Sequence, residues 1–374
     1  MSKILSLLLV CVFISSCSSV ESLMGDYYPQ AVKDDDQNFT LTWAKNLDPV
    51  YNSGNLPIAF NSPLINEGLV FAGHANGEMV AYQLDNGRPV WSEKDKGGHH
   101  GRPILYKDMI IYGTNQGRVI ARNFLTGKIV YSVDVGSSIE SQGVLYKGRV
   151  FFHLRNHQIF SLDATTGKTL WAYKRSVPYL TTLQRVSRPV IAENRLYVGF
   201  ADGNVGAFSI EDGVLLWEKK ISNGSKFIDI DSSPIYFDGK ILSASLTGQI
   251  SLLNARTGNL LKKVEISASR APLVLGDRFI VGTSDGYLVE LDSRLNEMRR
   301  VNISEGSITS MISWKGHIVA ASVVGELVLV NPKDFSVIES KHLGSKLSAV
   351  FGELDSKENK LALISSRNRL YVFK

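Results

Sequence analysis

A unit of about 40 residues recurs along most of this 374-residue chain, and this period restricts the possible folds more than any other feature. The clearest copy runs from Ser187 to Trp217 and contains short apolar segments separated by turns rich in glycine. Four short strands fit such a unit. Successive copies lie 40, 40, 46, 45, 38 and 39 residues apart and begin at Ser62, Arg102, Gln142, Arg188, Ser233, Ala271 and Ser310.

The turn before the last strand of each unit has a recognisable chemistry. In the third copy, Asp163 and Thr166 suit a turn that is held by bonds from side chains to the backbone, and Gly167 can adopt positive φ. A large ring follows at one equivalent position in four copies, and it can wedge between neighbouring units. These rings belong to Trp91, Tyr131, Trp171 and Trp217.

An eighth, more divergent copy runs from Ser348 to Lys374 and ends before its outermost strand. The segment Thr40–Leu47 resembles an outermost strand, so we expect it to complete the last unit and close the ring. Closure removes a sheet edge and an apolar face that would otherwise be open to association. The sequence therefore predicts an all-β fold, an eight-bladed β-propeller with four antiparallel strands per blade over residues 40–374.

The N-terminus carries the pattern of an export signal. Lys3 is followed by an apolar run of about eleven residues, too short for a transmembrane helix, which needs roughly 20. Ile14-Ser15-Ser16-Cys17 resembles a bacterial lipobox, which implies that residues 1–16 are removed and that Cys17 is acylated. Residues 17–39 are polar and aperiodic and are predicted to form a lipidated tether. The other cysteine, Cys11, lies in the removed segment, so an internal disulfide is excluded.

The segment Ser161–Trp171 is similar to the Ala-x-Asp-x-x-Thr-Gly-x-x-x-Trp pattern of the PQQ-like repeat family, with Ser161 in place of Ala. That repeat occurs in quinoprotein dehydrogenases, in sensor domains and in lipoproteins that are not enzymes. A lipobox followed by a single eight-bladed propeller resembles the lipoproteins that serve the β-barrel assembly machinery of the bacterial outer membrane. The resemblance implies a scaffold on the periplasmic face of the outer membrane, without a cofactor.

Two segments carry the expected partner contacts. Phe227–Pro234 is similar to an Asp-x-Asp-x-x-Pro element of these lipoproteins, and Leu183–Pro189 is similar to a second element, with a spacing one residue shorter. In the family, these loops are implicated in docking onto the periplasmic POTRA domains of the barrel-inserting subunit, BamA. The resemblance carries this role to Leu183, Arg185, Asp229 and Asp231. A structural alternative is that the two aspartates bond to turn amides.

Several sequence features bear on other functions. A quinoprotein dehydrogenase typically has a vicinal cysteine pair, which the mature chain lacks. His99 and His100 are adjacent on an extended segment and should point to opposite faces, while His153 and His157 lack helical spacing, so no metal site is expected. The net charge of +5 is dispersed, which disfavours nucleic-acid binding.

A propeller that binds or senses a small ligand in its channel stays open as an alternative function. Contact with unfolded outer-membrane proteins is a further expectation.

Overall fold

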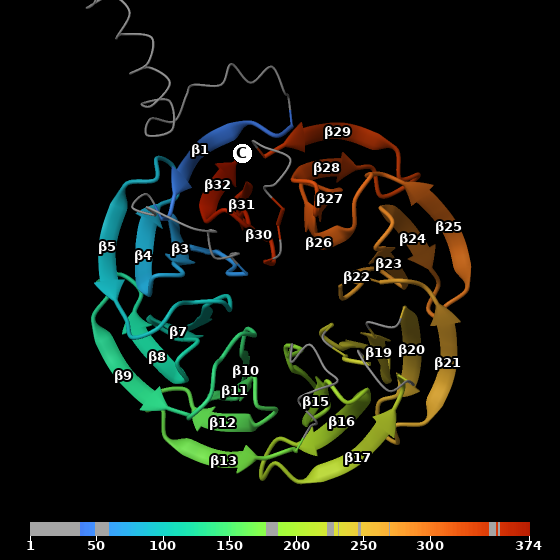
Figure 1. Cartoon of the computed structure of the whole chain (residues 1–374), viewed down its shortest axis with the longest axis horizontal. Coiled ribbons are helices and arrows are strands. Elements are labelled where there is room, and N and C mark those ends of the chain that lie inside the picture. Colours follow the sequence, from blue (N-terminus) through green and yellow to red (C-terminus); the bar gives the residue numbers. More distant parts are fainter. Residues whose placement is uncertain are drawn as a thin grey trace, which may run out of the picture.

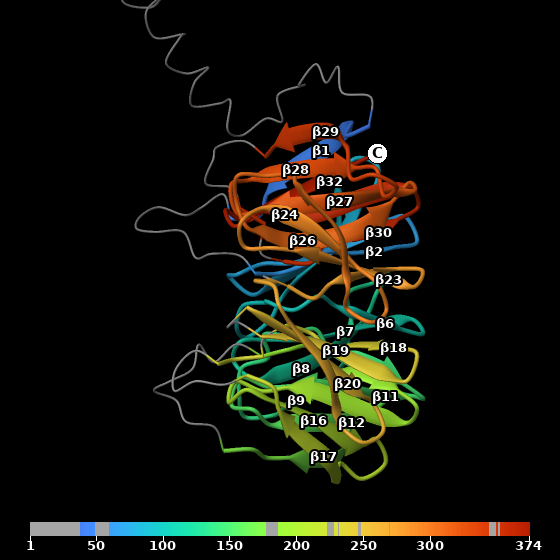
Figure 2. The ribbon, with the colours of Figure 1, turned by 90° about the vertical axis from the view of Figure 1, so that its right-hand side faces the viewer.

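A computed structural model describes residues 38–48, 60–176, 186–222, 228–230, 232–245, 248–268, 270–343, 349–350 and 352–374. Within these residues, strands β1 to β32 form eight antiparallel sheets of four strands each. The sheets surround a central axis as blades, and the ring is wider than it is thick (Figures 1 and 2). The predicted all-β, eight-bladed propeller is confirmed. No helix in the described ranges has the length and apolar character needed to cross a membrane.

Each blade is listed here from its innermost to its outermost strand. Blade 1 contains β2 (Leu64–Asn66), β3 (Leu69–Gly73), β4 (Glu78–Gln83) and β5 (Pro89–Lys94). Blade 2 contains β6 (Ile104–Tyr106), β7 (Met109–Gly113), β8 (Arg118–Asn123) and β9 (Ile129–Asp134). Blade 3 contains β10 (Val144–Tyr146), β11 (Arg149–His153), β12 (Ile159–Asp163) and β13 (Thr169–Tyr173). Blade 4 contains β14 (Val190–Ala192), β15 (Arg195–Gly199), β16 (Asn204–Ser209) and β17 (Leu215–Lys220).

The second half of the ring repeats this order. Blade 5 contains β18 (Ile235–Phe237), β19 (Lys240–Ser245), β20 (Gln249–Asn254) and β21 (Leu260–Glu265). Blade 6 contains β22 (Leu273–Leu275), β23 (Arg278–Gly282), β24 (Tyr287–Leu291) and β25 (Glu297–Asn302). Blade 7 contains β26 (Ile308–Trp314), β27 (His317–Ser322), β28 (Glu326–Val330) and β29 (Val337–His342). Blade 8 contains β30 (Asp355–Lys357), β31 (Lys360–Ile364), β32 (Arg369–Phe373) and β1 (Leu41–Asn46).

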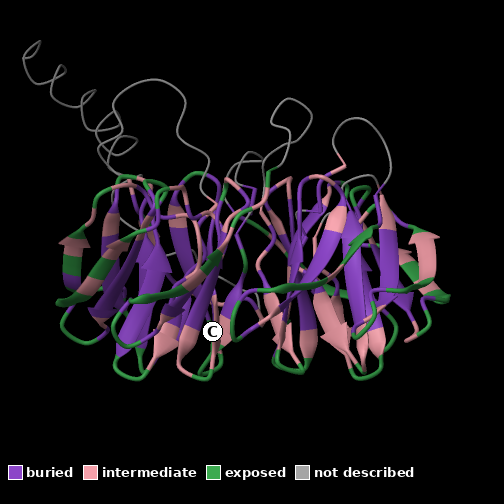
Figure 3. Ribbon diagram, turned by 90° about the horizontal axis from the view of Figure 1, so that it is seen from below, coloured by how far each residue is buried: buried purple, intermediate pink, exposed green. Residues whose placement is uncertain are grey.

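The core lies between neighbouring blades. The two middle strands of every blade are buried on both faces, whereas the outermost strands and the turns are more exposed (Figure 3). This arrangement explains why the middle strands are almost continuously apolar, as in β3 and β4. Each fully buried aliphatic or aromatic side chain contributes about 1.5–3 kcal/mol relative to an exposed one.

The turn of blade 3 forms as its sequence predicts. The Asp163 carboxylate accepts hydrogen bonds from the Thr166 amide and hydroxyl, both at 2.8 Å. Gly167 has a φ of 74°, and a Cβ atom there would lie 2.6 Å from the ring of Tyr131 in blade 2. Gly167 is therefore required both for the backbone conformation and for the close approach of the neighbouring blade.

The four predicted wedge residues link successive blades. The indole nitrogens of Trp91, Trp171 and Trp217 donate to turn carbonyls of the next blade at 2.8–3.0 Å. The Tyr131 hydroxyl makes the same link at 3.2 Å. Trp43 on β1 adds a fifth, because its indole donates to the Leu84 carbonyl at 2.8 Å and joins blade 8 to blade 1.

In blades 5 to 7, a charged side chain takes the place of the aromatic side chain at the same strand position. Lys262 donates to the Asn296 side chain at 2.6 Å, and Arg299 donates to the Lys333 carbonyl. Glu339 accepts the Asn38 and Phe39 amides, each at 3.1 Å. These contacts between neighbouring blades, here called seams, are therefore aromatic in five cases and polar in three.

The N-terminal segment closes the ring as expected. Strand β1 pairs antiparallel with β32, so the first and last described strands share blade 8. Phe39 is fully buried, and its ring stacks on Trp314 with ring centroids 5.8 Å apart. Lys341 donates to the Phe39 carbonyl at 3.0 Å. Among the described residues, contacts with the ring thus extend back to Asn38, two residues before the predicted start of the propeller.

Candidate functional site

The predicted docking residues belong to two connections of the same kind. One connection runs from β13 to β14 and the other from β17 to β18, so each joins the outermost strand of a blade to the innermost strand of the next. Because the strands alternate in direction, all connections of this kind lie on one face of the ring, here called the connection face. Leu183, Arg185 and Asp231 lie outside the described residues, as does the predicted lipidation site, Cys17.

Asp229 is the predicted docking residue that the structure describes, and its side chain is fully buried. The adjacent Ile230 anchors this part of the connection to blade 4. Its amide donates to the Phe200 carbonyl at 3.1 Å, and its side chain covers Gly199, where a Cβ atom would lie 2.5 Å from Ile230 Cγ2. Asp229 is thus held at the base of the connection.

A cavity of about 590 Å³ occupies the centre of the ring. All eight blades contribute to its lining, and the residues that mark the starts of the repeats form much of it. They include Ser62, Arg102, Gln142, Arg188, Ser233 and Ser310. The repeat start is therefore a channel position, a role that sequence periodicity alone does not reveal.

The cavity also borders both predicted docking segments. Val186 and Ser232, which directly follow Arg185 and Asp231 in the sequence, line it. Since these residues belong to the β13–β14 and β17–β18 connections, the cavity extends toward the connection face. The channel and the two predicted docking segments therefore adjoin one another.

Buried polar residues just before the repeat starts fix the innermost strands. The hydroxyls of Ser141, Ser187 and Thr309 each donate, at 3.0–3.2 Å, to a carbonyl twelve residues later. Asn61 makes the same kind of bond to the Gly73 carbonyl. These side chains satisfy backbone carbonyls in the interior, so their recurrence has a structural explanation.

Two arginine side chains in the cavity form ion pairs with acidic groups. Arg155 lies 3.0 Å from Glu140. Arg102 forms an ion pair with Asp355, whose carboxylate also accepts the Ile65 amide at 2.6 Å. Because Asp355 begins β30, these bonds tie blade 8 to blades 1 and 2 near the axis.

The histidines that the sequence singled out occupy different environments. His99 is buried against Tyr112 and lies 3.5 Å from Asp95, whereas the adjacent His100 lines the cavity. The two imidazoles thus have separate surroundings, as expected for neighbours on an extended segment. Among the residues that the structure describes, there is no group of three His, Cys, Asp or Glu side chains placed to hold a metal ion.

His153 and His157 pack together between blades 3 and 4, with ring centroids 5.6 Å apart. His153 Nδ1 lies 3.1 Å from the Ser187 carbonyl. Burial, reinforced by His157, lowers the pKa of His153 to about 3. Burial also lowers the pKa of His157 to about 4. Both side chains are therefore neutral near pH 7 and act as packing groups.

Blades 1 and 2 share a buried ionic network. Arg122 lies 2.5 Å from Asp95, and the Tyr112 hydroxyl donates to the same carboxylate at 2.7 Å. Arg122 also donates to the Gly127 carbonyl at 2.7 Å. Burial, reinforced by Asp95, raises the pKa of Tyr112 well above its ordinary value. The residues satisfy one another, so the network holds the two blades together.

Solved structures share this architecture. The crystal structure of BamB from Moraxella catarrhalis has a TM-score of 0.75 at 20% identity and covers 90% of this chain and 99% of that one. A quinohemoprotein alcohol dehydrogenase from Pseudomonas putida has a TM-score of 0.69 at 11% identity, with 93% and 78% covered. At these identities the likeness shows the fold alone.

Curated relatives carry the name "Outer membrane protein assembly factor BamB". The protein from Yersinia pestis is 25% identical over 190 residues, which cover 47% of this chain and 46% of that protein. The one from Kangiella koreensis is 30% identical over 128 residues, 33% of each. The matches thus span at most about half the length of these two relatives.

A family model described as "Outer membrane protein assembly factor BamB" matches residues 54–130 and 108–302. Together these ranges span residues 54–302, which is more than half of the chain and contains blades 1 to 6. The chain therefore belongs to the family of the outer membrane protein assembly factor BamB.

Proposed function

We propose that the chain is a scaffold without enzymatic activity that serves the assembly of β-barrel proteins in the outer membrane. Membership of the BamB family carries this proposal. The matched curated relatives are named as assembly factors, and the propeller offers a rigid support for binding segments. A single fold hosts many functions, so the dehydrogenase that shares this architecture adds no argument for an enzyme.

The proposed location is the periplasmic face of the outer membrane. Removal of residues 1–16 and acylation of Cys17 would anchor the chain there, with residues 17–39 as a tether. Two or more acyl chains give stable anchoring, whereas a single chain is marginal. Glu339 and Lys341 hold the start of the propeller at Asn38 and Phe39, so a pull on the tether acts on the seam between blades 7 and 8.

The proposed partner is a BamA-like barrel-inserting subunit, bound through its POTRA domains. Leu183, Arg185, Asp229 and Asp231 are the proposed docking residues. Their two connections are neighbours on the connection face, which supports one continuous contact surface. Because Asp229 is fully buried, we assign it the task of holding its connection, and we assign direct contact to the other three residues.

The proposed mechanism is binding and orientation. An arginine, a carboxylate and a leucine side chain supply a polar contact with an apolar anchor, as in many transient interfaces. The outermost strands present a second surface to unfolded clients. Val90, Ile129, Leu216, Leu261 and Met298 are exposed there, and an extended client segment can pair with such an edge.

Affinity purification of the intact protein from detergent-solubilised envelopes tests the partner. Mass spectrometry should identify the barrel-inserting subunit with the wild-type protein and show its loss with Arg185→Gln or Asp231→Asn. Absence of that subunit from the wild-type sample would contradict the proposal.

Matched controls separate docking from folding. Asp238→Asn makes the same chemical change in the β18–β19 turn of blade 5, on the face opposite the connections, where the Asp238 side chain is 80% exposed. This variant should keep the partner. Asp229 is a poor test residue, because substitution of a buried carboxylate also perturbs the fold.

A further inference from the structure

One ion pair crosses the central channel. Arg188 precedes β14 in blade 4, and Glu353 precedes β30 in blade 8. Blades 4 and 8 lie opposite each other across the axis of the ring (Figure 1). The Arg188 guanidinium nevertheless lies 3.5 Å from the Glu353 carboxylate and 2.9 Å from the Gln142 side-chain oxygen. Arg188 therefore reaches into the channel and takes Glu353 as its counter-ion.

Arginines are prominent along the cavity wall, and three of them have acidic partners. Arg102 pairs with Asp355, Arg155 with Glu140 and Arg188 with Glu353. The side chains of Arg155 and Arg188 are 51% and 37% exposed, so their guanidinium groups are accessible from the channel. Because an anion that enters the channel can replace an exposed acidic partner, these two arginines are candidate anion ligands.

The same cavity offers hydroxyl donors. Ser62 accepts the Glu353 amide at 2.7 Å, and Ser310 accepts the Leu354 amide at 3.3 Å. Because the oxygen of each hydroxyl is the acceptor in these bonds, its proton can be donated to a third group. Both residues line the cavity, so these hydroxyls are available to an anion in the channel.

We propose that the central channel binds a compact polyanion with two or more carboxylate or phosphate groups. Such a ligand replaces Glu353 as the partner of Arg188 and adds a second contact at Arg155. Guanidinium groups bind carboxylate and phosphate oxygens in a bidentate manner, which favours this class of ligand over neutral polar molecules. A volume of about 590 Å³ falls within the range of small-molecule sites. This proposal is independent of docking, because it rests on described channel residues.

Titration calorimetry on the purified full-length protein tests the site, with citrate and inorganic pyrophosphate as probes at fixed ionic strength. Arg188→Gln should weaken binding of the preferred probe at least tenfold. Glu353→Gln should strengthen it several-fold, because the internal competitor loses its charge. A gain of affinity cannot result from misfolding, so this second variant keeps the test valid if Arg188→Gln is unstable.

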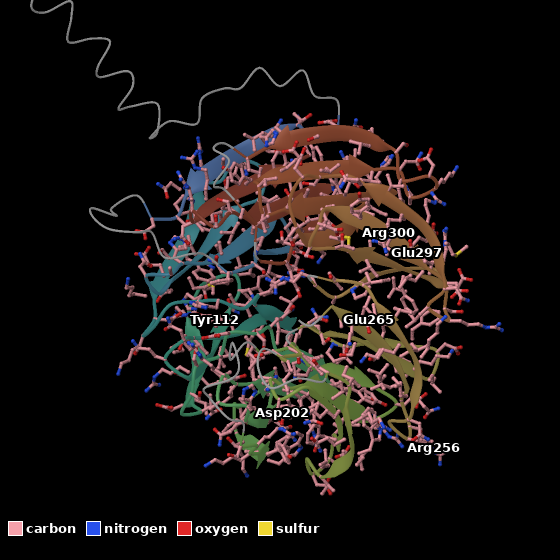
Figure 4. The ribbon with its side chains drawn as sticks, turned by 45° about the vertical axis from the view of Figure 1, so that its right-hand side comes forward. Tyr112, Asp202, Arg256, Glu265, Glu297 and Arg300 are labelled. Carbon is pink, nitrogen blue, oxygen red and sulfur yellow. The ribbon has the colours of Figure 1, made fainter. Side chains whose placement is uncertain are left out.

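Arg256→Gln is the matched control, because Arg256 lies on the outer rim of the ring, far from the axis (Figure 4). It should bind the probes like the wild-type protein. Preference for citrate would assign a carboxylate ligand, and preference for pyrophosphate a phosphate ligand. Equal losses in Arg188→Gln and Arg256→Gln would overturn the proposal, since they would indicate general attraction to a cationic protein. Absence of millimolar binding of both probes would also overturn it.

Discussion

Replacement of Trp91 by alanine tests how the blades are held together. The indole lies between blades 1 and 2, with its centroid 6.0 Å from the Phe71 ring and its nitrogen 2.8 Å from the Phe124 carbonyl. Truncation of a buried tryptophan costs about 3–5 kcal/mol through lost burial and the remaining cavity. The Phe124 carbonyl also loses its indole donor, so we expect a loss near the upper half of this range, about 4 kcal/mol.

Lys262→Ala is the internal comparison, because Lys262 occupies the same strand position in blade 5. It makes one solvent-exposed hydrogen bond to Asn296, and its removal should cost less than about 1 kcal/mol. Equilibrium unfolding in urea measures both variants. With an m value of about 3 kcal/mol/M, the midpoint of Trp91→Ala should fall by more than 1 M, and that of Lys262→Ala by a few tenths.

A double-mutant cycle with Gly127 identifies the contact. Gly127 has a φ of 71°, and a Cβ atom there would lie 2.8 Å from the Trp91 ring. Gly127→Ala should therefore be more damaging with Trp91 present than in the Trp91→Ala background, where only a backbone cost of about 1 kcal/mol is left. An equal cost of Gly127→Ala in both backgrounds, or a cost of Trp91→Ala no larger than that of Lys262→Ala, would contradict the role of Trp91 between the blades.

Two further predictions concern acid and ring closure. The pKa of His153 is about 3 in the folded protein and about 6.5 when unfolded, so the unfolded chain binds more protons between these values. The contribution of His153 to the free energy of unfolding is thus fully present above pH 6.5 and should fall by about 2 kcal/mol at pH 5. The urea midpoint should therefore differ less between these two pH values in His153→Asn than in the wild-type protein. An equal difference in both proteins would contradict the buried, neutral state of His153. Deletion of residues 38–46 removes β1 and exposes the β32 edge together with Trp314. An exposed sheet edge promotes association, so light scattering should detect oligomers of this variant. A strictly monomeric product would contradict the role of β1 in closing the ring.

The periodic part of the structure could be predicted from the sequence. The turn at Asp163 and Gly167 and the ring at Trp171 depend on residues that are close in the chain, and their repetition defines the blade. Closure by β1 was also predictable, because Thr40–Leu47 resembles an outermost strand while the last copy lacks one. These features are local patterns, or follow from counting them.

The channel and the polar seams could not be predicted in the same way. Arg188 and Glu353 belong to opposite blades, so only the three-dimensional ring brings them together. Lys262, Arg299 and Glu339 break the aromatic pattern, and a sequence search for rings passes over them although they make the same inter-blade links. Asp229 resembles a surface motif residue, and its burial depends on how the connection folds onto blade 4.

Site-specific photo-crosslinking in growing cells tests the proposed scaffold function most directly. A photoreactive residue would replace Arg185 or Asp231, the proposed contact residues, or Asp238 in the β18–β19 turn as the control. We expect covalent adducts with the barrel-inserting subunit from positions 185 and 231 and none from position 238. At wild-type levels of the protein, no adduct from either position 185 or position 231, or equal adducts from all three positions, would contradict the scaffold function.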